Sequence, residues 1–187
     1  MKDLSLNVLD ITHNSISAEA SLIELEVAEE NGAITITIKD NGKGIDPEML
    51  KTVTDPFTTS RTTRKVGMGL PLFKMAAEQT GGSLEIESTI GIGTEVQAIF
   101  YSSHIDCPPL GDMAASVAML AGALKDGSDL VYTRSFDNTS FVFDTRQIKE
   151  ALGEGISLAE PAVQDWIREY ITQQEDAIKG DKHEKLG

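Results

Sequence analysis

The feature that most constrains the fold is a stretch of alternating isoleucines that ends in an acidic, glycine-rich loop. Residues 33–39 carry isoleucine at every second position, which predicts a strand with one buried face. The strand is followed by Asp40-Asn41-Gly42-Lys43-Gly44. Glycine lets a backbone pass close to a ligand, and a carboxylate can accept a hydrogen bond from the exocyclic amine of adenine. An ordinary strand-ending turn explains the same residues without a ligand.

Helices and hairpins are predicted on both sides of this strand. Apolar residues at three- and four-residue spacing predict a helix over 4–18, and a second helix runs from Gly69 to a glycine pair at 81–82. Alternation predicts further strands at 21–28, 83–88 and 94–101. After Cys107-Pro108-Pro109 the sequence predicts a helix over 111–124, strands at 130–136 and 140–144, a helix over 145–152, and a helix from Pro161 whose apolar stripe includes Val163, Trp166, Ile167, Tyr170 and Ile171.

The charge balance limits the class of partner. The chain has 16 basic and 30 acidic residues, for a formal net charge of −14. Nucleic acids and anionic membranes attract clustered Lys and Arg, so neither is an expected partner. No apolar run approaches the roughly 20 residues of a membrane span, and we expect a cytoplasmic protein. Cys107 is the only cysteine, which excludes an internal disulfide.

A polar pair in the first predicted helix is a candidate metal site. Asp10 and Asn14 are four residues apart, so they share one helix face. The amide oxygen of Asn14 is a suitable ligand for a Mg²⁺ ion that bridges phosphates, because Mg²⁺ prefers oxygen. Asp10 could orient a metal-bound water or act as a general base toward an attacking water. A solvated helix face is the alternative for both residues.

Two further glycine motifs are candidate nucleotide contacts. Gly67-Met68-Gly69-Leu70 opens a predicted helix, and the backbone amides of such a turn suit a phosphate. Thr94 follows Gly91-Ile92-Gly93 at the start of a predicted strand. Its hydroxyl could bond to Asp40, directly or through a shared water, around adenine. Hairpin turns need similar glycines without any ligand.

Residues 46–66, between these motifs, are polar, have no clean periodicity and are predicted to be mobile. The segment holds the one local basic cluster of the chain, Arg61, Arg64 and Lys65. Because this cluster lies just before the glycine turn at 67–70, we expect it to pair with a triphosphate. A solvated loop is the alternative.

In this order, the motifs resemble those of the ATP-binding domain shared by gyrase, a heat-shock chaperone, sensor histidine kinases and the MutL mismatch-repair proteins. The resemblance covers about residues 4–101. Residues 55–60 look like the F box of sensor kinases, which makes the kinase catalytic domain the most similar branch. The other motifs look like the N box (Asp10, Asn14), the adenine-binding box (Asp40, Gly42, Gly44), the second glycine box (Gly67, Gly69) and the last box (Gly93-Thr94).

The resemblance implies ATP and Mg²⁺ as ligands, with Asn14 on the metal, Asp10 as the catalytic residue and residues 46–66 as a lid over ATP. It implies an α+β fold of two layers, the Bergerat fold, in which helices cover one face of a mixed, mostly antiparallel sheet. The residues that it places on the nucleotide are Asn14, Asp40, Gly42, Gly44, Arg61, Arg64, Lys65, Gly67, Met68, Gly69, Leu70 and Thr94.

Three departures separate the chain from the family pattern. Pro71 stands where sensor kinases usually have a third glycine. Asp10 is one methylene shorter than the catalytic Glu of the gyrase and chaperone branch, which bears on hydrolysis. His13, His104 and His183 lie outside the context of a phospho-accepting histidine.

The predicted domains are an ATP-binding domain at 1–104, a small α/β appendage of unknown role at 105–179 and a disordered tail at 180–187. We expect a stand-alone Mg·ATP-binding regulatory protein that presents a nucleotide-dependent surface to a protein partner, which it could phosphorylate. A slow ATPase with Asp10 as the base and an interaction module without catalysis are the alternatives. Residues 103–112 resemble a tail of small ATP-binding proteins encoded near iron hydrogenases, which suggests a redox enzyme or its regulator as the partner. A homodimer is left open.

Overall fold

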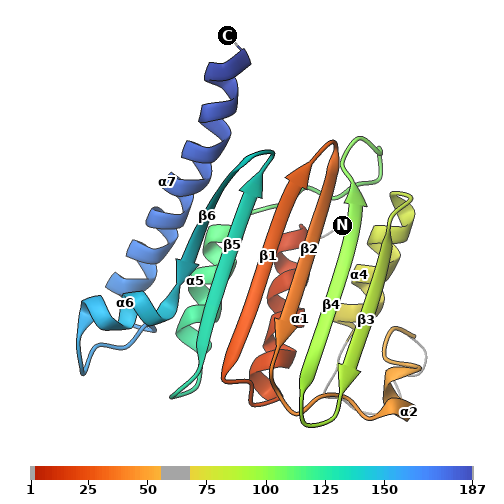
Figure 1. The fold of residues 1–187 in the computed structure, drawn as a ribbon, viewed down its shortest axis with the longest axis horizontal. Helices are drawn as coiled ribbons and strands as arrows, with labels where there is room; N and C mark the ends of the chain where they lie inside the picture. Colours follow the sequence, from red (N-terminus) through yellow and green to blue (C-terminus); the bar gives the residue numbers. More distant parts are fainter. Residues whose placement is uncertain (1–2, 56–67, 187) are drawn as a thin grey trace.

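A six-stranded mixed sheet forms one layer of the molecule. The computed structural model describes residues 3–55 and 68–186, with side chains as far as Gly180. In space the strands follow the order β3-β4-β2-β1-β5-β6 (Figure 1). Their bounds are β1 Leu22–Glu30, β2 Ala33–Asp40, β3 Ser83–Thr89, β4 Gly93–Tyr101, β5 Asp129–Phe136 and β6 Thr139–Asp144. Each strand predicted from the sequence is present, with ends shifted by at most two residues.

Pairing among the described strands is mostly antiparallel, and of these strands only β1 and β5 run parallel. The β1–β2 hairpin closes on Asn31 and Gly32, whose φ angles of 52° and 76° suit a type I′ turn. In the register, Asp40 at the end of β2 lies opposite Ile23 of β1 and Thr94 of β4. The predicted mixed, mostly antiparallel sheet is therefore confirmed.

Helices form the second layer, behind the sheet in the view of Figure 1. This layer contains α1 (Leu4–Ser17), α4 (Gly69–Gln79) and α5 (Met113–Ala123), and α7 (Pro161–Leu186) packs on α5 and β6. Two short helices, α2 (Pro47–Leu50) and α6 (Thr145–Leu152), lie in connections. Burial alternates along the strands: Leu25 and Ile36 are at most 1% exposed, while Glu24 and Glu26 face solvent. One covered and one solvated sheet face define the two-layer sandwich.

The C-terminal part of the chain extends the same sheet and core. β5 pairs with β1, and α5 packs against α1. The connecting segment holds the first turn of α1, because the backbone amides of Leu4 and Ser5 donate to the carbonyls of Pro109 and Leu110. The predicted domain boundary between residues 104 and 105 therefore lies where the motifs end. The hydrophobic core continues across it.

Helix α7 differs from its prediction in two ways. It continues to Leu186, across the segment that the sequence predicts to be disordered from residue 180. Residues 181–186 contain neither Gly nor Pro, and Lys, Glu and Leu favour a helix that has already formed. Trp166 is 48% exposed rather than buried, since it lies one position away from the four-residue spacing of Val163, Ile167 and Ile171. Its ring stacks on Tyr170 instead, with centroids 5.1 Å apart.

Candidate nucleotide-binding site

A cavity of about 510 Å³ lies between α1, the loop after β2 and the covered face of β2, β3 and β4. Its walls are mainly the apolar side chains of Ile11, Ile38, Leu70, Ile86 and Val96. The polar side chains that reach it include Asn14, Ser15, Asp40 and Thr94. Apolar walls with a few converging polar groups are typical of small-molecule sites, and the volume suits a ligand of nucleotide size.

Asp40 is the fixed acceptor of this cavity. It ends β2 on the covered face, where it is 9% exposed. Its Oδ2 accepts a hydrogen bond from Ser15 Oγ at 2.5 Å, and its Oδ1 accepts one from the backbone amide of Gly42 at 2.9 Å. A carboxylate has about four lone-pair sites, so two protein donors leave it able to accept from a ligand.

The glycines of the loop after β2 are required by close backbone packing. A Cβ at Gly42 would lie 2.7 Å from the carbonyl oxygen of Ala18 on α1. At Gly44, where φ is +78°, a Cβ would lie 2.3 Å from the carbonyl oxygen of Thr89. The Lys43 amide also donates to the Ala18 carbonyl at 3.0 Å. These contacts hold the loop between α1 and the β3–β4 hairpin, which fixes the floor of the cavity.

The two residues of the predicted metal site, Asp10 and Asn14, lie in different surroundings. Asn14 is half-buried and lines the cavity, whereas Asp10, one turn earlier on α1, is exposed and is not among the described lining residues. The start of α4 approaches Asp10 closely: a Cβ on Gly69 would lie 3.4 Å from Ile11 Cγ1 and 3.6 Å from Asp10 Cβ. The structure therefore brings the N box beside the second glycine motif.

Around that motif, Met68 is the N-cap residue of α4, and Leu70 is buried against the cavity. Pro71 falls in the first turn of α4, where a missing backbone N–H costs no helical hydrogen bond. Arg61, Arg64, Lys65 and Gly67 lie outside the described residues, as does the predicted lid beyond Asp55.

Thr94 lines the cavity, but its direct hydroxyl contact is with a different partner from the predicted one. Its Oγ1 lies 2.7 Å from Ser88 Oγ, because Ser88 is opposite Thr94 in the β3–β4 pairing. Asp40 is bonded to Ser15 and Gly42 instead. Ser88 Oγ also accepts a hydrogen bond from the Ile45 amide at 2.8 Å, so these two hydroxyls tie the loop to the hairpin.

Four polar residues that line the cavity among the described residues are not among the site residues predicted from the sequence: Ser15, Ser17, Lys43 and Asp46. The available signal for Ser15 was a hydroxyl at a buried helix position directly after Asn14. The partner of that hydroxyl lies 25 residues away and is not visible in local periodicity.

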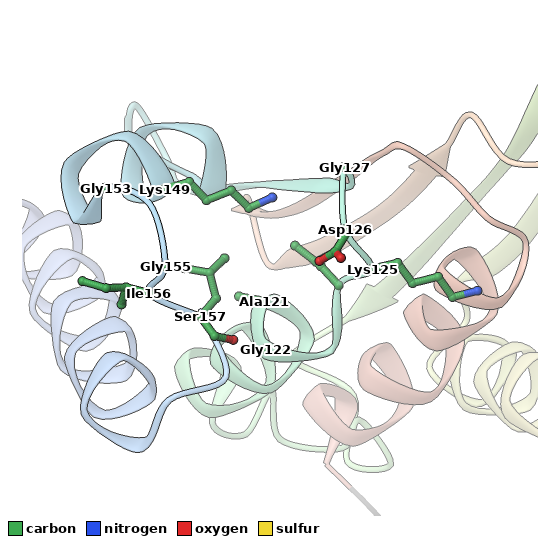
Figure 2. Close-up of a pocket in the computed structure, with 12 residues that line it drawn as sticks. Ala121, Gly122, Lys125, Asp126, Gly127, Lys149, Gly153, Gly155, Ile156 and Ser157 are labelled. Carbon is green, nitrogen blue, oxygen red and sulfur yellow. The ribbon is translucent and has the colours of Figure 1, made fainter.

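A second cavity, of about 410 Å³, lies between the end of α5, α6 and the loop before α7 (Figure 2). Lys125 and Lys149 line this cavity, and Lys149 Nζ already donates to the Ser128 carbonyl at 2.6 Å and to Asp129 Oδ1 at 3.0 Å. Glycines 122, 127, 153 and 155 supply much of the remaining wall and carry no functional group. The Asp40 cavity is therefore the stronger candidate.

Among the described side chains, at 3–55 and 68–180, no three His, Cys, Asp or Glu residues gather closely enough to hold a metal ion. No helix in that part of the chain combines the length and the apolar character needed to cross a membrane.

The fold is a two-layer domain, and its cavity contains the nearly buried carboxylate of Asp40. The family described as histidine kinase-, DNA gyrase B- and HSP90-like ATPase matches residues 2–103. This match covers more than half of the chain, which therefore belongs to this family of ATP-binding domains.

The curated relatives are sensor and sporulation proteins. The chain is 33% identical to sporulation kinase D of Bacillus subtilis over 91 residues, which are 48% of this chain and 18% of that protein. It is 42% identical to sensor protein SrrB of Staphylococcus aureus over 77 residues, which are 38% of this chain and 13% of that protein. The chain thus spans less than a fifth of the length of these relatives.

Among solved structures, the N-terminal domain of a DNA repair protein has a similar fold. The TM-score is 0.51 at 15% sequence identity, and the alignment covers 76% of this chain and 52% of that chain. This likeness concerns the fold alone. The structural alignment covers 76% of this chain, whereas the match to sporulation kinase D covers 48% of it.

Proposed function

We propose that the chain binds ATP with Mg²⁺ in the Asp40 cavity and acts in the cytoplasm as a nucleotide-dependent regulator of a protein partner. The observation that carries the proposal is the nearly buried Asp40 carboxylate, fixed by two donors in an apolar cavity of an ATPase-family domain. A buried acceptor selects a ligand with a donor at that point, and the exocyclic amine of adenine supplies one. Guanine presents a carbonyl oxygen at the same position, which a carboxylate repels.

The phosphates of the nucleotide would extend toward the start of α4. This helix has 11 residues, and Gly69 at its N-terminus lies against Asp10 and Ile11. Backbone amides and the positive end of the helix dipole favour an anion there. Arg61, Arg64 and Lys65 belong to the proposal through their sequence position just before this turn.

Asn14 is the proposed metal ligand. It lines the cavity one turn from Asp10, and the two lie on the α1 face that α4 approaches. Since the described residues contain no acidic or histidine cluster for a metal, phosphate and water oxygens would complete the coordination of Mg²⁺. Such a site holds the ion only together with the nucleotide.

Transfer of the γ-phosphoryl group has two candidate acceptors. In hydrolysis, the water oxygen bonds to the γ-phosphorus, the bond to the β–γ bridging oxygen breaks, ADP leaves and Asp10 takes the proton of the water. In a kinase reaction, a side chain of the partner replaces the water. The names of the relatives, a sporulation kinase and a sensor protein, support the kinase reaction. A redox enzyme or its regulator as the partner, and a homodimer, stay within the proposal as expectations from the sequence.

Calorimetry with ATP and GTP, each with and without MgCl₂, tests the proposed binding function. We expect ATP to bind more tightly than GTP and Mg²⁺ to tighten ATP binding. Equal affinity for the two nucleotides, or no binding of either, would contradict the proposal. Incubation with γ-labelled ATP then separates the outcomes: label on a partner indicates a kinase, released phosphate an ATPase, and unchanged ATP an interaction module.

A further inference from the structure

We infer that Ser15 is a positioning residue that sets the base specificity of the nucleotide site. The inference rests on the proposed function of the Asp40 cavity as an ATP site. Ser15 follows Asn14 on α1 and is 3% exposed. Its Oγ donates to Asp40 Oδ2 at 2.5 Å, a contact between a helix and the end of the central strand β2.

Together with Gly42, Ser15 fixes the orientation of the carboxylate. The Gly42 amide holds Oδ1 and the Ser15 hydroxyl holds Oδ2, so rotation of the group would break at least one of the two bonds. The donors come from different elements, the loop after β2 and α1. Because both oxygens are held, their remaining lone pairs point into the cavity in a fixed direction. Discrimination between ligand groups depends on such fixed geometry, because an adaptable acceptor can turn away from an unsuitable ligand.

Removal of the Ser15 hydroxyl should free the carboxylate without releasing the loop. The loop is anchored to α1 separately, by the hydrogen bond from the Lys43 amide to the Ala18 carbonyl and by the packing of Gly42 on Ala18. Neither contact involves a side-chain hydroxyl. The expected defect is therefore confined to the acceptor geometry of Asp40.

Inosine triphosphate is a suitable probe of that geometry. It differs from ATP at the position that faces Asp40 in the proposed site, where a carbonyl oxygen replaces the amine. In the parent protein the fixed carboxylate should accept the amine of ATP and repel the oxygen of inosine triphosphate. In Ser15→Ala, a carboxylate that rotates should bind ATP less well and reject inosine triphosphate less strongly.

The test is calorimetry of both nucleotides with MgCl₂ on the parent, Ser15→Ala and Thr12→Ala. Thr12 is a matched control, because it is buried in the same helix and its hydroxyl has no hydrogen-bond partner among the described residues. Ordering one side chain corresponds to a change of about two- to tenfold in affinity. We expect Ser15→Ala to lose ATP affinity by this factor and to narrow the preference for ATP over inosine triphosphate, while Thr12→Ala keeps the parent preference.

The outcomes separate the inference from the proposed function. A folded Ser15→Ala protein with the parent preference overturns the positioning role and leaves the ATP site intact. A parent protein that does not prefer ATP contradicts the proposed function itself. If thermal melting shows that Ser15→Ala does not fold, Ser15→Cys is measured instead, since a thiol has a similar shape and is a weak donor. A parent preference in the Cys variant overturns the inference, and a narrowed preference supports it.

Discussion

At the scale of single residues, the proposed recognition of the base depends on the charge of Asp40. Asp40→Asn should lower ATP affinity by about tenfold to more than a hundredfold, because hydrogen bonds to charged groups are worth roughly 1.5 to 3 kcal/mol and the amide can present its donor end to the adenine amine. Calorimetry measures the change. Glu24→Gln is a control, since it makes the same kind of change on the solvated face of the sheet. Parent affinity in the Asp40 variant would rule out the adenine contact.

Asn14 should control the response to the metal. Its side chain is the proposed protein ligand for Mg²⁺, and it lines the cavity beside the apolar wall of α1. In Asn14→Ala, nucleotide binding through the base should persist but should no longer tighten when Mg²⁺ is added, because phosphates and waters alone cannot fix the ion against the protein. A magnesium titration at fixed ATP measures this. Tightening equal to that of the parent would mean that Asn14 does not bind the metal.

Asp10 should distinguish hydrolysis from binding. Its carboxylate is exposed beside the start of α4, where it could reach a water near the phosphates. If it is the general base, Asp10→Asn should keep its affinity for Mg·ATP and lose about a hundredfold or more in phosphate release, since a general base usually contributes about 10²–10⁴ to the rate. Unchanged release would leave Asp10 with an orienting or structural role.

The residue pattern predicts Asp40 better than it predicts the partners of Asp40. A strand of alternating isoleucines places a following carboxylate at the covered end of the sheet, so its position follows from local spacing. Its bond to Ser15 depends on how α1 crosses that sheet end, which no local pattern encodes. For the same reason, local spacing does not indicate that the Thr94 hydroxyl contacts Ser88.

At the scale of elements, helix α7 carries a carboxyl within its apolar stripe. Val163, Ile167, Ile171 and Ile178 are buried at near-helical spacing, and Glu175 completes the same face. Glu175 Oε1 accepts a hydrogen bond from Tyr132 OH of β5 at 3.1 Å. The neighbouring Arg134 of β5 is fully buried and donates to Glu29 Oε1 of β1 at 3.0 Å. Periodicity predicted the helix and most of its stripe, but this polar network joins residues too distant for any local signal.

The burial of Glu175 leads to a prediction about how the stability of the fold depends on pH. Burial raises the pKa of Glu175 above its ordinary value, although Arg134, Tyr132 and Lys179 act in the opposite direction. A carboxyl with a raised folded-state pKa stabilises the fold fully below its ordinary pKa and loses that contribution as pH rises through the folded-state pKa. The unfolding free energy of the parent minus that of Glu175→Gln should therefore decrease as pH rises from below about 4.3, the ordinary pKa of Glu.

Urea denaturation of the two proteins at a series of pH values measures this difference. Asp144, whose pKa is lowered chiefly by its hydrogen bond to Arg146, titrates in both proteins and cancels in the subtraction. Thr172→Ala changes an exposed residue of the same helix and serves as a control. The difference in unfolding free energy between the parent and this variant should not depend on pH. A Glu175 difference that is constant or increases with pH would contradict the burial effect.

At the scale of the whole molecule, the boundary drawn by motifs and the boundary drawn by packing do not coincide. The family match ends at residue 103, where the sequence predicts a domain boundary. Across that point, β5 pairs with β1 over eight residue pairs, Ser116 Oγ donates to the Ser5 carbonyl at 3.0 Å, and one core includes Val8, Leu25 and Val117. Sequence motifs report where the ligand binds, whereas the extent of a core depends on strand order, which the sequence did not predict.

Residues 1–104 expressed alone should therefore be much less stable than the full chain. Removal of 105–187 turns β1 into an edge strand and uncovers apolar residues of α1 and β1 that α5 and β5 now cover. We expect either no cooperative thermal transition or a large decrease in melting temperature. For a domain of this size, a loss of about 1 kcal/mol lowers the melting temperature by about 4–8 °C, and the decrease should be well above that. Deletion of 181–187 is the control, since the described buried stripe of α7 ends at Ile178 and this deletion should change the melting temperature by less than that amount. A 1–104 fragment that melts with the full chain and binds ATP equally well would show that the C-terminal part is a separable appendage, as the sequence alone predicts.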